Sequence, residues 1–215
     1  RRSSDLEIDI VDIDDRSVLV IRDDGSGIDD PAKILTLGDS GWDADLAKRE
    51  DPAGMGVFSL AGRYVEIRSR SHTAGSGWRV AITPEAWENG TSLAIGADDI
   101  ATGTEIRIDM PEAWAKDIAA VAASAARYYP LPVTFLGDEL GREDFLAGAY
   151  WIEESLGCRI GVFHDRTYLP NAHPRINFHG LTVICPLPGI CEVMDGEKWH
   201  VQVDIVDAPA LQLVL

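Results

Sequence analysis

Apolar and polar residues alternate with a period of two along the first part of the chain. Leu6, Ile8 and Ile10 are separated by polar residues, a pattern typical of a half-buried strand. The apolar run 17–21 follows a polar turn, so these two segments predict a β-hairpin. Further strands are predicted at 64–71 and 78–83, which form a second hairpin, and at 104–110 and 133–136.

Helical patterns lie between these strands. A short helix is predicted over 32–37, with Pro31 at its first position. A second helix is expected from Gly56 to Gly62, and the longest covers 112–129. Its apolar stripe contains Trp114, Ile118 and Val121.

The fold class expected from these elements is α/β, in the form of an α+β sandwich. One mixed β-sheet would carry helices on one face. From about residue 147 the pattern becomes strand-rich, at 159–163, 175–185 and 199–206. We therefore expect a first domain over 1–146 and a second, incomplete α/β domain over 147–215.

Composition narrows the possible partners and setting. The chain has 215 residues with a net charge of −17, which argues against a broad basic surface for nucleic acid in this segment. No apolar run reaches the roughly 18–20 residues that span a bilayer, so no membrane partner is expected. Three cysteines are too few for a disulfide scaffold, and a reducing, cytoplasmic setting is the expectation.

The cysteines and histidines do not predict a metal site or a catalytic set. Cys185 and Cys191, with His173 and His179, fit no zinc-ligand spacing. The two cysteines are better explained as apolar residues flanking a turn. The remaining histidines are scattered, and no Ser/His/Asp set can be assembled.

Three glycine-centred segments carry most of the chemical information. They are, in order, Asp23–Ile28 after the apolar run, Gly54–Leu60, and Gly103–Asp109. Glycine lets a backbone approach a ligand closely and adopt positive φ. A glycine-rich turn that opens a helix presents free N–H groups to a phosphate. Together with an acid at a strand end, these segments predict a nucleotide pocket.

The order of these segments resembles that of the GHKL ATPases, the superfamily of DNA gyrase B, the ninety-kilodalton heat-shock chaperone, sensor histidine kinases and MutL. The resemblance covers roughly residues 5–136. It implies a Bergerat fold, ATP as the ligand and Mg²⁺ in the intact protein. The strand-rich C-terminal part resembles the start of a transducer domain, which favours the gyrase, chaperone and MutL side.

The resemblance also assigns roles to individual residues. Asp23 would accept the exocyclic amine of adenine, and Thr104 would help to hold the adenine–water network. The loop 38–53 would be a lid that closes over ATP and drives dimer closure. Further residues would line the nucleotide site: Gly25, Gly27 and Ile28 at the base, and Gly54, Met55, Gly56, Val57 and Phe58 at the phosphates.

Simpler interpretations remain open for each assignment. The acids around Asp23 could form a surface turn, whereas an EF-hand calcium loop fails because Gly25 occupies its third position. Thr104 could serve β-propensity alone. The turn at Gly54 and Gly56 could only pack a helix start, and 38–53 could be an ordinary loop.

Two family features have no counterpart in the sequence. The resemblance implies a helix before the first strand that carries a water-activating Glu and a magnesium-binding Asn, but the chain starts at Arg1. No match to the transducer lysine is found before Leu215. We therefore expect a fragment of a longer ATPase without an identifiable catalytic residue. A non-catalytic nucleotide-binding switch and a non-nucleotide interaction domain are the alternatives.

Overall fold

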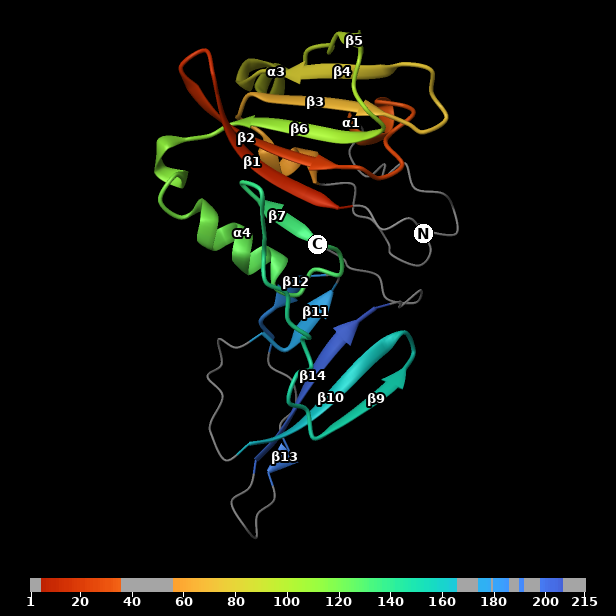
Figure 1. Ribbon diagram of the computed structural model, residues 1–215, viewed down its shortest axis with the longest axis vertical. Coiled ribbons are helices and arrows are strands. Elements are labelled where there is room, and N and C mark those ends of the chain that lie inside the picture. The colour runs from red at the N-terminus through yellow and green to blue at the C-terminus, as the bar shows by residue number, and fades with distance from the viewer. Residues whose placement is uncertain are drawn as a thin grey trace.

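The computed structural model describes residues 5–35, 56–165, 174–178, 180–185, 190–191 and 198–206. The first part of the chain forms an eight-stranded sheet with the order β5-β4-β3-β6-β2-β1-β7-β8 (Figure 1). Its strands are β1 (Leu6–Ile13), β2 (Arg16–Asp23), β3 (Val65–Arg70), β4 (Gly77–Ile82), β5 (Ile95–Asp98), β6 (Gly103–Asp109), β7 (Val133–Phe135) and β8 (Asp138–Glu139). The sheet is mixed, because β1 and β7 run parallel whereas the other neighbours are antiparallel.

A second, six-stranded mixed sheet follows and lies below the first in Figure 1. Its path is β12-β11-β14-β10-β9, and β13 pairs with β14. The strands are β9 (Trp151–Ser155), β10 (Cys158–Asp165), β11 (Ile176–Phe178), β12 (Leu181–Val183), β13 (Ile190–Cys191) and β14 (Lys198–Ile205). The predicted α/β class is therefore confirmed. The predicted single strand over 175–185 is wrong, since it is a hairpin that turns at Gly180. The domain boundary at residue 146 stays a prediction.

The first hairpin shows why the alternating pattern was informative. Eight pairs join β1 and β2 in one uninterrupted register. The connecting residues Asp14 and Asp15 have φ values of 49° and 61°. Two positive φ values in a two-residue turn match the twist of the flanking strands, and Asp tolerates this conformation. The pattern and the turn chemistry thus specify the same hairpin.

The three predicted helices are shorter in the structure, and the helix over 84–89 was not predicted. The described residues form α1 (Ala32–Leu35), η1 (Val57–Leu60), α3 (Pro84–Asn89), η2 (Glu112–Trp114) and α4 (Ile118–Ala126). The helix predicted from Gly56 to Gly62 is a single 3₁₀ turn, and Gly62 has a φ of 81°, which ends it. Among the described residues, no helix combines the length and apolar character needed to cross a bilayer.

The long helix predicted over 112–129 is also wrong. It is divided into η2 and α4, and Val121, placed on the apolar stripe, is 59% exposed. The buried residues of α4 are Ala122 and Ala126, one turn apart on the helix. Small side chains on this face allow α4 to lie close to β7, with which it is in contact. Because α4 is rich in alanine, the hydrophobic pattern of its sequence does not indicate which face is buried.

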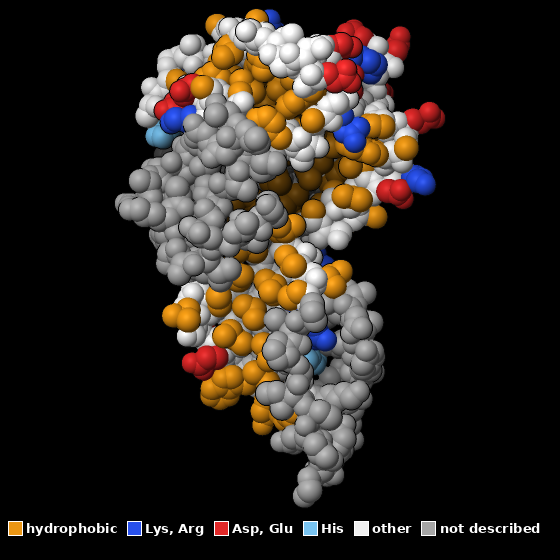
Figure 2. All heavy atoms as spheres, turned by 180° about the vertical axis from the view of Figure 1, so that it is seen from behind, with side chains coloured by type: hydrophobic (Ala, Val, Ile, Leu, Met, Phe, Trp, Pro, Cys, Tyr) orange, Lys and Arg blue, Asp and Glu red, His pale blue; other side chains and the backbone are white. Residues whose placement is uncertain are grey.

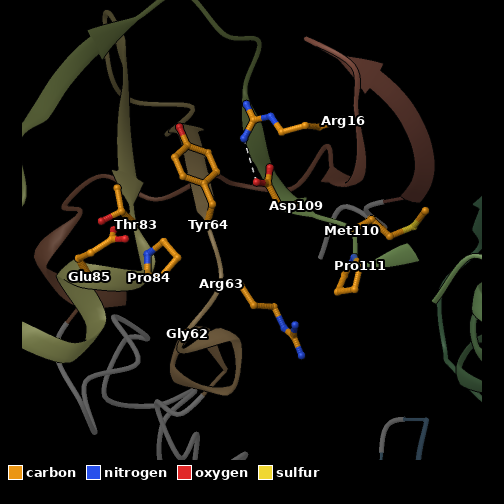
Figure 3. Close-up of a pocket in the computed structure, with 10 residues that line it drawn as sticks. All are labelled: Arg16, Gly62, Arg63, Tyr64, Thr83, Pro84, Glu85, Asp109, Met110 and Pro111. Carbon is orange, nitrogen blue, oxygen red and sulfur yellow. Dashed lines mark hydrogen bonds and ion pairs between the residues drawn. The ribbon is translucent and has the colours of Figure 1, made fainter. Parts of the chain in front are cut away.

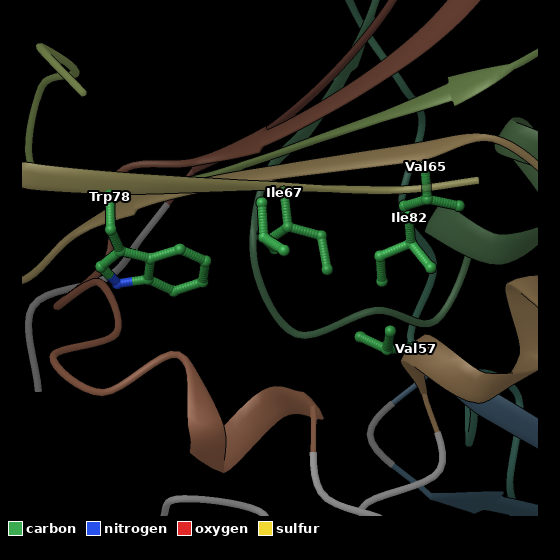
Figure 4. Close-up of a cluster of buried hydrophobic side chains, with 6 residues drawn as sticks. Val57, Val65, Ile67, Trp78 and Ile82 are labelled. Atoms are coloured by element: carbon green, nitrogen blue, oxygen red, sulfur yellow. The ribbon is translucent and has the colours of Figure 1, made fainter. Parts of the chain in front are cut away.

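One face of the first sheet holds the main apolar core. Val65, Ile67, Val80 and Ile82 project from β3 and β4 and are almost fully buried (Figure 4). Val57 from η1 and Trp78 complete the cluster, and residues of α1 and α3 pack against it. Period-two alternation places all the strand members on the same face. The expectation of helices on one face of this sheet is confirmed.

The opposite face of the sheet carries an ionic network centred on Glu105. The Glu105 carboxylate accepts hydrogen bonds from Arg22 Nε at 2.6 Å, Arg107 Nε at 2.7 Å and Arg68 Nη1 at 2.9 Å. Arg22 also donates to Asp9, at 2.8 Å. Burial alone would raise the pKa of Glu105, but the three arginines outweigh it and hold the pKa below its usual value. The Glu105 side chain is therefore a charged centre shared by β2, β3 and β6.

Candidate functional site

The predicted adenine acid lies at the end of a strand, in a row of polar side chains. Asp23 is the last residue of β2, and it is paired with Thr104 of β6. Thr104 is paired in turn with Ser69 of β3. Directly paired residues project to the same face. The prediction that Thr104 lies on a strand beside Asp23 is confirmed, and Ser69 extends the row.

The environment of Asp23 makes its charge costly. Burial raises the pKa of the carboxyl above its usual value, and the charge of Asp24 adds to this. Hydrogen bonds from the Gly25 N–H, at 2.9 Å, and from the Thr104 hydroxyl act in the opposite direction without cancelling the effect. A partly buried acceptor with a raised pKa is typical of a binding group rather than of a solvated turn.

Ser69 is fully buried and links three segments by hydrogen bonds, although no pattern in the sequence indicates it. Its Oγ accepts a hydrogen bond from the Ile28 N–H at 2.9 Å and donates to the Gly103 carbonyl at 2.8 Å. It also lies 3.1 Å from Thr104 Oγ1. Each hydroxyl has one proton, and Ser69 gives its proton to the Gly103 carbonyl, so the Thr104 hydroxyl donates either to Asp23 or to Ser69 Oγ. A serine at one position of an alternating strand does not indicate, from sequence alone, that its hydroxyl will link three segments.

At two positions of this site another backbone segment approaches so closely that only glycine fits. Gly27 has a φ of 65°, and a Cβ there would lie 2.0 Å from the Arg70 carbonyl oxygen. Gly103 has a φ of 128°, and a Cβ there would lie 2.1 Å from the carbonyl oxygen of Asp23. Both glycines therefore let two protein backbones pack closely together. For Gly27 this reason differs from the predicted one, which was contact with the adenine base.

Ile28 is held from both sides of its peptide unit. Its N–H is bonded to Ser69, and its carbonyl accepts from Trp78 Nε1 at 2.8 Å. Its side chain packs against the main core cluster. The loop after β2 is thus fixed to β3 and β4, which holds the Asp23 end of the strand in place.

We expect replacement of Ser69 by Ala to lower the free energy of unfolding by about 1–2 kcal/mol, because the Ile28 N–H and the Gly103 carbonyl would lose a partner in a buried place. Urea unfolding measures the change. Ser59→Ala is the matched control, since the Ser59 hydroxyl bonds to the Gly56 carbonyl on an exposed turn, and about 0.5 kcal/mol or less is expected there. Equal losses in the two variants would contradict a structural role for Ser69.

The acids that follow the first glycine segment serve local turns. Asp30 Oδ1 accepts from the Ala32 N–H at 2.9 Å, and Asp29 Oδ1 accepts from the Asp30 N–H at 2.9 Å. Lys33 pairs with Asp29 at 3.2 Å. Within the described part of the chain, no group of three or more His, Cys, Asp or Glu side chains is arranged to hold a metal ion. These contacts agree with the turn interpretation for these acids.

The predicted phosphate segment is only partly described. Gly54 and Met55, and the predicted lid at 38–53, lie outside the described residues. Val57 is buried in the core, and the Phe58 ring packs edge-on against Trp87 with centroids 6.0 Å apart. Both line a small cavity of about 220 Å³ that shares no lining residue with the cavity at Asp23. Val57 and Phe58 therefore serve packing, whereas Gly56 is exposed, and the phosphate role of this segment stays a prediction.

A cavity of about 530 Å³ opens at the strand ends around Asp23. Glu7, Arg22 and Glu105 line it, and their pairing places them on the charged face, opposite the face of Asp23 and Thr104. The volume suits a nucleotide. Five of its twelve lining residues are nevertheless acidic and only one is basic, which disfavours phosphate. The lining residues are Asp5, Glu7, Arg22, Asp23, Asp24, Ile100, Ala101, Thr102, Gly103, Thr104, Glu105 and Thr134.

The apolar face offers a different kind of space. Leu6, Ile8, Ile21 and Ile106 are only half-buried there, and register places Leu6 directly beside Asp23. From behind, the molecule shows a recess with apolar walls between its upper and lower parts (Figure 2). An aromatic base fits apolar walls with a single polar anchor better than it fits the acidic cavity.

Tyr129 lies near Asp23 and was not predicted. Burial raises the pKa of its hydroxyl, and the negative charge of Asp23 raises it further. Gly180, in the turn between β11 and β12, has a φ of 96°, and a Cβ there would lie 2.9 Å from Tyr129 Cα. The β11–β12 turn of the second sheet therefore packs against Tyr129, whose pKa is raised by burial and by the charge of Asp23.

An open groove of about 510 Å³ lies at the other end of the first sheet (Figure 3). Arg16 pairs with Asp109 across it at 2.9 Å. Arg63 points away from this pair and stacks over the Trp114 ring, 4.5 Å from its centroid. None of the predicted site residues lines this groove, which is formed by Arg16, Gly62, Arg63, Tyr64, Thr83, Pro84, Glu85, Asp109, Met110 and Pro111.

Comparison with known proteins gives a limited result. No protein-family model and no curated protein matches the chain. Among solved structures, the Aquifex aeolicus MutL ATPase domain complexed with ADP is 14% identical, with a TM-score of 0.45 over 85% of this chain and 76% of that one. Another structure of the ATPase domain of the Aquifex aeolicus mismatch repair endonuclease MutL is 12% identical, with a TM-score of 0.48 over 99% of this chain and 85% of that one. Values this low do not assign the chain to a family, so a function has to rest on the geometry of the site.

Proposed function

We propose that this chain is an ATP-binding domain of the GHKL type, which recognises adenine through Asp23. The observation that carries the proposal is the row Asp23, Thr104 and Ser69, which joins the ends of three adjacent strands on one face. An ionised carboxylate accepts hydrogen bonds only, so it suits the exocyclic amine of adenine. Thr104 supplies a second polar group beside it, and the half-buried apolar side chains of this face supply walls for the base.

The residues present fit the adenine end of the ligand better than its phosphates. Val57 packs in the core, whereas Gly56 is exposed, and no described metal cluster fits Mg²⁺. In this proposal the segment 54–58 holds the phosphates, and the Mg²⁺ contacts lie outside the described residues. ATP would close 38–53 as a lid and drive conformational change or dimer closure.

A nucleotide-binding switch without catalysis is the second candidate. Three of the described acids near Asp23 are engaged: Glu105 and Glu7 pair with Arg22, and Asp24 Oδ1 accepts from the Asp5 N–H at 2.8 Å. The lowered pKa of Glu105 is unsuited to a general base near neutral pH. Turnover of ATP by the chain, and by a version extended upstream, separates the switch from the ATPase.

The proposal is tested by base selectivity. ATP should bind about tenfold or more tightly than GTP, because the Asp23 carboxylate would face the guanine carbonyl in place of an amine. Isothermal titration with each nucleotide, without and with Mg²⁺, measures the difference. Equal affinities would place the base elsewhere, and no binding of either nucleotide would leave the chain as an interaction domain.

The lid assignment has its own expected result. Amide hydrogen exchange in 38–53 should slow on saturation with a non-hydrolysable ATP analogue, since closure would shield this polar segment from solvent. The hairpin β9–β10 of the second sheet is the internal control, because it carries none of the proposed nucleotide contacts and its exchange should be unchanged. Unchanged exchange throughout 38–53 at saturation would remove the lid from the proposal.

A further inference from the structure

The outer edge of β9 differs from the other sheet edges. Each sheet ends on an edge strand, and β5, β8 and β12 have four, two and three residues, whereas β9 has five. Very short edge strands limit pairing with another chain, and longer ones offer a row of backbone donors and acceptors. In the described part of the chain, β9 pairs with β10 alone. It lies at the outer side of the lower sheet in Figure 1.

Large apolar side chains are exposed along this edge. All five residues of β9 are exposed, and Trp151 and Ile152 are 60% and 41% exposed. Leu156, directly after the strand, is 91% exposed. Apolar side chains gather over the lower sheet in Figure 2, with acidic atoms at their margin. An exposed apolar group beside free backbone groups is a feature of strands that receive a partner strand.

The charges of β9 disfavour pairing with a second copy. Glu153 and Glu154 follow Trp151 and Ile152, and neither forms an ion pair with another described residue. Antiparallel pairing of two β9 strands about their centre would place Glu153 opposite Glu153, and one of the two registers shifted by one would place it opposite Glu154. Like charges directly opposite each other destabilise a pair of strands. The net charge of −17 adds to the repulsion between copies.

We propose that β9 is a docking edge for an extended basic segment of another protein, which adds a strand to the second sheet. Successive side chains alternate between the two faces, so each face of β9 presents one apolar residue and one acid. An antiparallel partner strand would therefore carry two adjacent basic residues followed by two apolar ones. Lysine or arginine would lie opposite Glu153 and Glu154, and apolar side chains opposite Trp151 and Ile152. This inference does not depend on nucleotide binding.

The probe is a capped eight-residue peptide with two adjacent lysines followed by valine and isoleucine, flanked by threonines. Titration into the ¹⁵N-labelled chain should shift the amides of β9 and slow their exchange. Affinity should fall at least about tenfold in the double variant Glu153→Lys, Glu154→Lys, because the peptide lysines would then face like charges. A peptide N-methylated at alternate residues, which cannot donate to the edge, should show the same loss.

Matched controls separate strand addition from charge attraction. Asp138→Lys with Glu139→Lys makes the same charge change on the exposed edge strand β8, and it should leave the affinity unchanged. Circular dichroism and urea unfolding verify that both double variants fold. Equal binding of the N-methylated peptide, equal losses in the two double variants, or no β9 shifts with the lysine peptide would overturn the proposal. So would sedimentation showing a dimer with protected β9 amides, which would make a second copy the occupant.

Discussion

Replacement of Glu105 by Gln should lower the free energy of unfolding by about 2–3 kcal/mol, the largest stability loss we expect from a single polar change. The Glu105 side chain is 8% exposed and accepts from three arginines. The arginine side chains are 19–35% exposed, so water compensates part of the loss. Without the carboxylate, Arg22, Arg68 and Arg107 would repel one another on adjacent strands.

Urea unfolding near pH 7 measures this loss, and Glu7→Gln is its control. Glu7 belongs to the same network but is half exposed and touches Arg22 at 3.4 Å, so a change of about 0.5 kcal/mol is expected. The pH dependence gives a second check. Because the folded pKa of Glu105 is lowered, its contribution is present above the unfolded pKa and disappears as the pH falls through the folded pKa. If the two variants were equally stable, the network would not be centred on Glu105.

Replacement of Asp23 by Asn should weaken ATP binding by about 10- to 100-fold, which corresponds to about 1.5–3 kcal/mol for a hydrogen bond to a charged group. The stability of the nucleotide-free chain should change in the other direction or stay the same. Burial raises the folded pKa of Asp23, so ionisation of this carboxyl costs the folded chain some stability compared with the unfolded chain. Asn keeps the acceptor for the Gly25 N–H and removes that charge.

Titration calorimetry and urea unfolding of the same sample measure both effects. Asp24→Asn makes the same charge change one residue away, at an exposed side chain, and it should leave ATP affinity within about twofold. Lost binding together with lost stability would mean that Asp23 is a structural residue. Unchanged affinity in Asp23→Asn would remove Asp23 from the nucleotide site.

The strands of the first sheet could be predicted because two independent signals agree on them. Alternating apolar residues at Leu6, Ile8 and Ile10 specify a face, and the aspartate turn specifies the hairpin. The pairing of Asp23 with Thr104 also followed from the order of the glycine segments. Local sequence was therefore sufficient to predict the strands. The family resemblance was needed to place Asp23 and Thr104 side by side, and neither signal indicated Ser69.

The remaining features depend on contacts that are distant in sequence. Glu105 meets Arg22 and Arg68, 83 and 37 residues away, and an isolated Glu in a strand gives no indication of either. Ser69 is buried only because β6 and the loop after β2 cover it. The predicted helix at Gly56 is a single 3₁₀ turn that places Val57 in the core, and it ends just before Gly62, whose positive φ does not continue a helix.

The strand order also determines how this chain can fold. The hairpins β1–β2 and β3–β4 are local and can form early, but within the sheet their strands are joined through β6, which lies between β2 and β3 and is made later in the chain. The strand pairing of the first sheet is therefore complete only after Gly103–Asp109 has been synthesised and inserted. Because Asp23, Thr104 and Ser69 come one from each of these three strands, no partly folded intermediate that lacks β6 can hold a ligand there. Binding at this row would thus report completion of the sheet, and a ligand present during refolding should favour the last step over the earlier ones.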